Sequence, residues 1–260
     1  MDSQSPVRRS WPHALAWLAL ALLILTTSAH LATKPPPMPA YAAVRADWQP
    51  SEAWLYDRDG QLLDSERVNF ERRRLAWVPL KEISPAVRTA VVASEDRRFW
   101  SHGGVDWLAV ASAIRSRLKI MGGTGDRSRG ASTLPMQLAA FLDPSLAQPG
   151  KRDWRTKLRQ MRAAQALTEN WSHTEMLEAY FNLVPLRGEA QGIGAGSRTL
   201  FGKRPADMTR TDAALFAGLL PNPTAGAEAL GRRACRVAQT RDCTAIRAAA
   251  ATLVLSLIHI

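Results

Sequence analysis

The stretch "SPAVRTAVVASEDRRFWSHGGVD", at residues 84–106, begins like a helix and ends in a cluster of charges. Ser84 and Pro85 are typical of a helix start, with serine as the N-cap and proline at the first helical position. Apolar residues follow from Val87 at helical spacing. The helix ends at Glu95, where the pattern would next place a core residue. We therefore expect the Glu95 carboxyl group to lie at the edge of a core and face a cleft.

The surroundings of Glu95 suggest two interpretations. Partial burial and the neighbouring Asp96 would raise the pKa of Glu95 toward the range of a general base. Arg97 and Arg98 would lower it. In the simpler alternative, an acidic helix end pairs with its own arginines and has no chemical role.

The remainder of the chain is predicted to be mainly α, with one small β-hairpin near the start. Asp59 and Gly60 form the expected hairpin turn within "AWLYDRDGQLLDS". We expect Ser132 to cap a helix, and capping boxes at Ser172-x-x-Glu175 and Thr209-x-x-Asp212 to start two more. The further helices are predicted at residues 105–120, 133–142, 151–170 and 172–184, and one more begins at Thr209 and stops at Pro221.

The N-terminus predicts export. Residues 1–13 include Arg8 and Arg9, and residues 14–32 carry no formal charge. That run would span roughly 28 Å as a helix, close to a bilayer core. We predict a cytoplasmic N-terminus, a transmembrane signal-anchor at 14–32 and a proline-rich spacer at 33–50, the alternative being a cleaved signal peptide. The expected location is the bacterial inner membrane, single-pass, with the remaining domain extracytoplasmic.

The net charge of +11 suggests a polyanionic partner. Export argues against nucleic acid and favours inner-membrane lipids and cell-envelope polymers. Cys235 and Cys243 are the two cysteines, and outside the cytoplasm they form either a local disulfide or two unpaired thiols. The apolar "WLAVASAI" stretch is either a face that enters the membrane or ordinary core.

Five motifs resemble, in family order, those of the family 51 peptidoglycan glycosyltransferases. The first is Glu-Asp-x-x-Phe followed by His102, Gly104 and Asp106. The others are "RGASTLPMQLAAFLDP", "KLRQ" in part, "EMLEAYFNLVPLRGEAQGIGAGSRTLFGK" and "DAALFAGLLPNPT". The sequence of the second motif looks most like that of the type 1C class A penicillin-binding proteins. The resemblance places the glycosyltransferase domain at residues 51–223.

The resemblance implies a lysozyme-like, two-lobed helical fold and a reaction on lipid II. The 4-hydroxyl of one lipid II attacks the growing glycan strand, with inversion and release of undecaprenyl pyrophosphate, and Glu95 is the general base. Gln160 occupies the second catalytic position. Cell-wall synthesis proteins are candidate partners. The implied substrate-binding residues are Asp96, Phe99, His102, Ser132, Thr133, Gln137, Arg155, Lys157 and Arg159.

Several positions depart from the family pattern. Ala140 stands where a cation is usual, Thr156 where an arginine is usual, and Gln160 where a glutamate is usual. Glutamine cannot carry charge or bind a cation as strongly as glutamate. We therefore predict no certain cofactor. A divalent cation such as magnesium is the candidate that stays open. Pro135 also departs, in a helical turn that tolerates proline.

Two other functions remain open. A scaffold that binds lipid II with weak or no turnover would fit Ala140 and Gln160. A lytic transglycosylase would use a similar glutamate to cleave the polymer, although the ordered motifs argue against it. Residues 224–260 are expected to be a linker or truncated tail without a transpeptidase domain, and "LVLSLIHI" suggests an artificial end.

Overall fold

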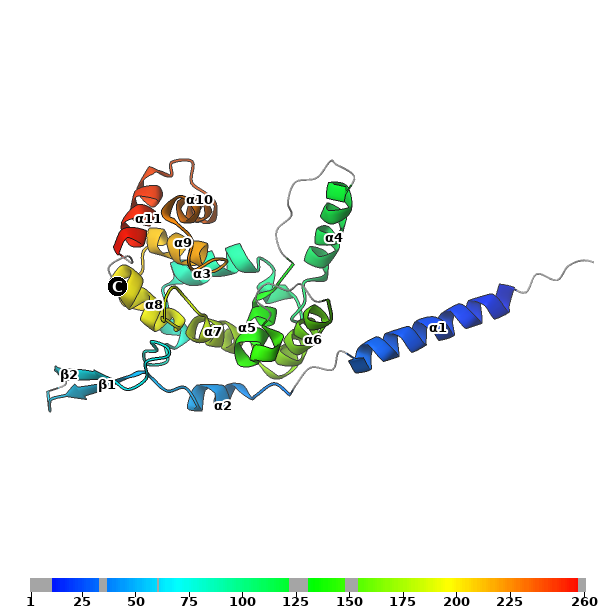
Figure 1. Ribbon diagram of the computed structural model, residues 1–260, viewed down its shortest axis with the longest axis horizontal. Coiled ribbons are helices and arrows are strands. Elements are labelled where there is room, and N and C mark those ends of the chain that lie inside the picture. Colours follow the sequence, from blue (N-terminus) through cyan, green and yellow to red (C-terminus); the bar gives the residue numbers. More distant parts are fainter. Residues whose placement is uncertain (1–10, 33–36, 60, 122–130, 148–153, 257–260) are drawn as a thin grey trace, which may run out of the picture.

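The computed structural model describes residues 11–32, 37–59, 61–121, 131–147 and 154–256, and it is mainly helical (Figure 1). The prediction of a mainly α chain with one small hairpin is confirmed. The elements are α1 (Trp11–Ala32), α2 (Tyr41–Ala46), β1 (Glu52–Tyr56), β2 (Leu62–Arg67), α3 (Pro85–Glu95), α4 (Trp107–Met121), α5 (Leu134–Leu142), α6 (Trp154–Asn170), α7 (His173–Leu183), α8 (Gly192–Phe201), α9 (Arg210–Leu219), α10 (Ala227–Ala238) and α11 (Thr244–Ser256).

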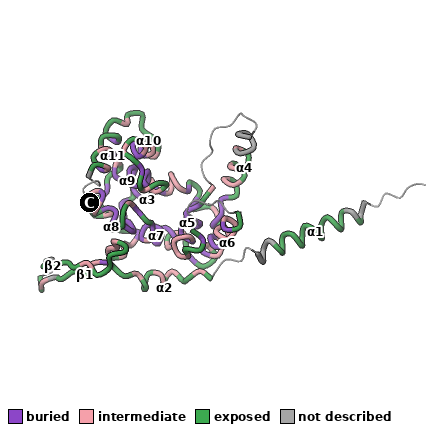
Figure 2. Tube along the Cα trace, viewed as in Figure 1, coloured by how far each residue is buried: buried purple, intermediate pink, exposed green. Residues whose placement is uncertain are grey.

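Strands β1 and β2 form the expected antiparallel hairpin. Their register runs from Glu52 opposite Arg67 to Tyr56 opposite Leu62, with an irregularity between Leu55 and Tyr56. Gly60, predicted as half of the turn, lies outside the described residues. The hairpin projects from the helical body and is mostly exposed (Figure 2).

Helix α7 lies in the main core. Every residue from Met176 to Asn182 is buried. Helix α5 packs against α6 and α7, and α3 packs against α9. The valines that gave α3 its predicted apolar face, Val87 and Val91, are fully buried. The helix bearing Glu95 is thus held firmly against the core, whereas α4 extends away from the body (Figure 1).

Of the four predicted N-caps, two form as expected, and the one at Ser132 is wrong. Both capping boxes form, with Ser172 and Glu175 at α7 and with Thr209 and Asp212 at α9. At α5 the N-cap is Thr133, whose Oγ1 accepts from the Met136 amide, and not the predicted Ser132. Ser132 lies one residue too early for its side chain to reach the free amides of the first turn.

Ser84 occupies the predicted N-cap position of α3, and Pro85 follows in the first turn. The Ser84 side chain makes no cap hydrogen bond. Its hydroxyl donates instead to the Met208 carbonyl at 2.9 Å, just before α9. Ser84 therefore joins the start of α3 to the start of α9.

The N-terminal segments differ in part from the prediction. Among the residues that the structure describes, no helix is long and apolar enough to cross a membrane, so the predicted anchor is not confirmed. Within the predicted spacer, residues 41–46 form α2. The Tyr41 ring lies edge-on to Trp77 and Trp171, and its hydroxyl donates to Glu178 Oε1 at 2.5 Å. This part of the spacer is attached to the core.

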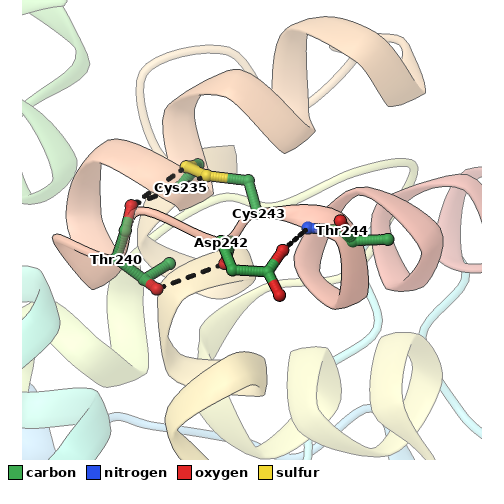
Figure 3. The surroundings of a disulfide bond; sticks show 5 residues. All are labelled: Cys235, Thr240, Asp242, Cys243 and Thr244. Atoms are coloured by element: carbon green, nitrogen blue, oxygen red, sulfur yellow. Dashed lines mark hydrogen bonds between the residues drawn. A yellow bond between two sulfur atoms is a disulfide. The ribbon is translucent and has the colours of Figure 1, made fainter.

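The segment after residue 223, predicted as a linker, contains α10 and α11. Both pack against α9 around a second core that includes Leu230, Ile246 and Leu253. Cys235 and Cys243 form a disulfide (Figure 3), which settles the alternative left open by the sequence. Residues 257–260, the end of the suspected artificial segment, lie outside the described residues.

Candidate active site

Glu95 is the last residue of α3 and lines a pocket of about 390 Å³. Ser132 and Gln137 line one part of the wall, and Gly218 of α9 and Arg236 of α10 line another. Burial raises the pKa of the Glu95 carboxyl, the Gln137 hydrogen bond lowers it, and the charge of Asp96 raises it; the net direction is upward. The expected combination of core edge and cleft is therefore present.

Gln137 holds the Glu95 carboxylate in place. Its Nε2 donates to Glu95 Oε2 at 3.0 Å, and its Oε1 accepts from the Tyr180 hydroxyl at 3.1 Å. Tyr180 is fully buried on α7. Because an ionised carboxylate can only accept, the Gln137 Nε2 group faces Glu95, which leaves the amide oxygen for the Tyr180 hydroxyl. Three helices, α3, α5 and α7, thereby set the position of one carboxylate.

Asp96, the residue after Glu95, is buried. Its side chain is 2% exposed, and its two oxygens lie 2.9 and 3.0 Å from His102 Nε2. Asp96 Oδ2 also accepts from the Leu134 amide at 3.0 Å, at the start of α5. This contact satisfies a free helix-start amide and favours negative charge there. Asp96 joins the end of α3 to α5.

The loop after Glu95 is also held by contacts with neighbouring residues. Phe99 is fully buried and packs edge-on against His173. Asp106 accepts from Arg98 at 2.7 and 2.8 Å and from the Ala109 amide at the start of α4. Substrate contact by Asp96, Phe99 and His102 stays a prediction, and their observed contacts shape the loop.

Gly104 fixes this loop against α6. Its φ is +83°, and a Cβ added there would lie 2.4 Å from the Ala164 carbonyl oxygen. Thr133 Oγ1 donates to the Gly104 carbonyl at 2.6 Å. The predicted substrate residue Thr133 is therefore buried between the loop and α5.

Lys157 lies behind the pocket wall on α6. Its Nζ donates to Ser132 Oγ at 2.7 Å and lies 3.4 Å from Gln160 Oε1. Gln160 Nε2 donates to the Leu146 carbonyl at 2.5 Å, so the amide oxygen is turned toward Lys157. Burial lowers the pKa of Lys157. The predicted residues Ser132, Lys157 and Gln160 are brought together in one cluster.

Arg155 and Arg159, also on α6, are not among the residues that line the pocket. Arg155 stacks over Trp154 at 5.4 Å, and Arg159 reaches Ser145 Oγ at 3.5 Å. Thr156, which replaces the family's arginine, is buried. Within the described residues, no group of three or more His, Cys, Asp and Glu side chains could hold a metal ion.

A family model described as transglycosylase matches residues 59–245, which is more than half of the chain. The chain belongs to the transglycosylase family. It is therefore an enzyme of the glycosyltransferase class. The match extends past residue 223 and includes all of α10.

Curated relatives agree with this assignment. This transglycosylase is 37% identical over 211 residues to a biosynthetic peptidoglycan transglycosylase of Rhodospirillum centenum, covering 80% of this chain and 77% of the relative. It is 36% identical to a protein of the same name from Aeromonas hydrophila, covering 61% and 66%. It is 35% identical to penicillin-binding protein 2D of Bacillus subtilis, covering 67% of this chain and only 24% of that protein.

Sequence reasoning missed the part of the transglycosylase pocket formed by α10. Arg233, Arg236 and Gln239 line it together with Glu95. Arg233 and Arg236 are three residues apart in "RRACRVAQ", a spacing that places side chains on one helix face. That spacing was the available signal, and the expectation of a linker after residue 223 concealed it.

Proposed function

We propose that this protein polymerises lipid II into glycan strands and releases undecaprenyl pyrophosphate, with Glu95 as general base. It is a peptidoglycan glycosyltransferase by family. The observation that carries the mechanism is the half-buried Glu95 carboxylate, held by Gln137 at 3.0 Å on the wall of a pocket. Relatives named biosynthetic peptidoglycan transglycosylase support the substrate class.

The Glu95 carboxylate takes the proton of the attacking 4-hydroxyl. As that proton leaves, the hydroxyl oxygen bonds to the anomeric carbon of the growing strand. The bond from that carbon to the pyrophosphate oxygen breaks, and its electron pair leaves with undecaprenyl pyrophosphate. Attack and departure occur on opposite faces, so the configuration inverts. A base with an upward-shifted pKa is suited to this transfer near neutral pH.

Lys157 supplies positive charge for the departing pyrophosphate. Preorganised cations stabilise charge that develops in a transition state. Ser132 and Gln160 hold the Lys157 ammonium from two sides. Gln160 thus acts through Lys157 as a positioning residue, which accounts for how an uncharged side chain can serve at this place.

Membrane association completes the proposal. Residues 14–32 carry no formal charge, and the exposed apolar side chains of α1 include Leu18 and Leu25. Helix α4 exposes Trp107, Leu108 and Ile114, a face suited to a lipid surface. We propose a single-pass inner-membrane anchor, an extracytoplasmic domain beginning near residue 51, and the family's lysozyme-like two-lobed arrangement with α10 included.

The test is polymerisation of labelled lipid II by detergent-purified protein. We expect Glu95→Gln to lose about 10²–10⁴-fold in rate, while Glu82→Gln, which removes an exposed carboxylate near the start of α3, retains full rate. Equal polymerisation by wild type and Glu95→Gln would contradict the role of Glu95. Binding of lipid II without polymer from any variant would favour the scaffold, and cleavage of preformed strands would favour a lytic enzyme.

A further inference from the structure

Three arginines form a basic wall of the Glu95 pocket. Arg233 and Arg236 of α10 and Arg97, two residues after Glu95, all line the pocket. Lys157 of α6 donates a hydrogen bond to Ser132, which lines the same pocket. Positive side chains from α10, from the segment after α3 and from α6 are therefore grouped around this pocket.

The arginines of this wall differ from others in the described residues. Arg98, Arg204 and Arg232 each form an ion pair with a carboxylate. Within the described chain, no ion pair neutralises the three arginines of the wall, and Arg233 makes a long 3.4 Å hydrogen bond to the Gly218 carbonyl. Three guanidinium groups that line one pocket and form no ion pair among the described residues are suited to an anionic ligand.

The turn that follows the wall is held in an unusual conformation. Gln239, which lines the pocket, ends α10 with φ of +52°, a region that non-glycine residues seldom adopt. The disulfide joins Cys235, next to Arg236, to Cys243 beyond that turn (Figure 3). A covalent link of this kind limits how far the end of α10 can move.

We propose that Arg233, Arg236 and Arg97 form an anion-binding wall that holds the acceptor lipid II while its hydroxyl meets Glu95. The inference rests on the proposed function. A transfer between two lipid-linked sugars brings two negatively charged substrates to one base. Lys157 serves the departing pyrophosphate, so the second anion needs cations elsewhere, and the α10 wall provides them. The anion is the acceptor's pyrophosphate or a carboxylate of its peptide stem.

The experiment compares Arg233→Gln/Arg236→Gln with Arg232→Gln. Arg232 lies on the same helix and pairs with Glu228, outside the pocket wall. For the double variant we expect the KM for lipid II to rise about tenfold, kcat to stay near wild type, and the salt dependence of KM to weaken. Arg233→Lys/Arg236→Lys should recover most of the affinity, because the charge is kept.

A second arm measures lipid II binding in proteins that also carry Glu95→Gln, so that it needs no turnover. Lipid II with amidated stem carboxylates distinguishes the two sources of charge. If the double variant binds this ligand as well as the protein with intact arginines does, the arginines bind a stem carboxylate. If the double variant still binds it more weakly, they bind the pyrophosphate. Equal binding of lipid II by the double variant and by Arg232→Gln would overturn the proposal that the wall binds lipid II. Failure of the wild type to polymerise lipid II would overturn the proposed function. The binding measurement would still show whether the arginine wall binds lipid II.

Discussion

Replacing Asp96 with alanine should destabilise the protein because the carboxylate serves two buried donors. His102 Nε2 lies 2.9 and 3.0 Å from its oxygens, and the Leu134 amide donates at 3.0 Å. The side chains of Asp96 and His102 are only 2% and 9% exposed, so water cannot replace the lost acceptor. Breaking a buried pair of this kind costs about 3–5 kcal/mol.

For a chain of this size, that loss corresponds to a fall in Tm of about 6–20 °C. The assay is thermal unfolding followed by circular dichroism in detergent. Asp96→Asn keeps one acceptor oxygen and should cost about 1–3 kcal/mol. Asp207→Ala is the control, because Asp207 forms an exposed ion pair with Arg204, and it should leave Tm nearly unchanged.

The same variants test whether Asp96 positions the site or touches substrate. A positioning role predicts that Asp96→Asn lowers kcat through a misplaced Glu95 while the KM for lipid II changes little. If Asp96→Ala unfolds at the same temperature as the wild type, the two buried hydrogen bonds do not stabilise the fold and the argument fails. If Asp96→Asn instead raises KM alone, Asp96 contacts the substrate.

Three further predictions follow from the site and its supports. Activity needs the unprotonated base, so kcat/KM should rise with pH through the raised pKa of Glu95. The Gln137 hydrogen bond lowers this pKa. Gln137→Met removes that bond and should therefore move the acid side of the pH–rate profile to higher pH. Gly104→Ala should lower the free energy of unfolding in urea by about 2–4 kcal/mol, whereas Gly103→Ala, with nothing within 4 Å of the added Cβ, should not. Cys235→Ser breaks the disulfide and should cost about 2–3 kcal/mol, and reductant should lower the Tm of the wild type but not of this variant.

The sequence was most informative where local chemistry decides the structure. Capping boxes depend on two residues three positions apart, so Ser172 and Thr209 were placed correctly. The exposure of Glu95 to a pocket followed from an apolar helix that ends in a carboxylate. The hairpin followed from turn residues between two short apolar runs.

Contacts between distant segments were not predictable in the same way. By residue type Ser132 is the better cap. The structure uses Thr133 instead, which also contacts Gly104, 29 residues away. The hydrogen bond from Tyr180 to Gln137 required knowing that α5 and α7 are neighbours. The α10 wall was missed because the residues after about Pro223 were predicted to be a linker, although alanine and arginine favour a helix.

The two contacts from the end of α3 to α5 have a consequence for how substrates enter. Asp96 and Glu95, adjacent in sequence, are each tied to α5, through Leu134 and Gln137. On the other side of the pocket, α10 packs against α9 around the second core, and the disulfide ties its end to Cys243. Both sides of the pocket are therefore anchored to the core, so we expect an entering substrate to meet a preformed site and not to displace a helix.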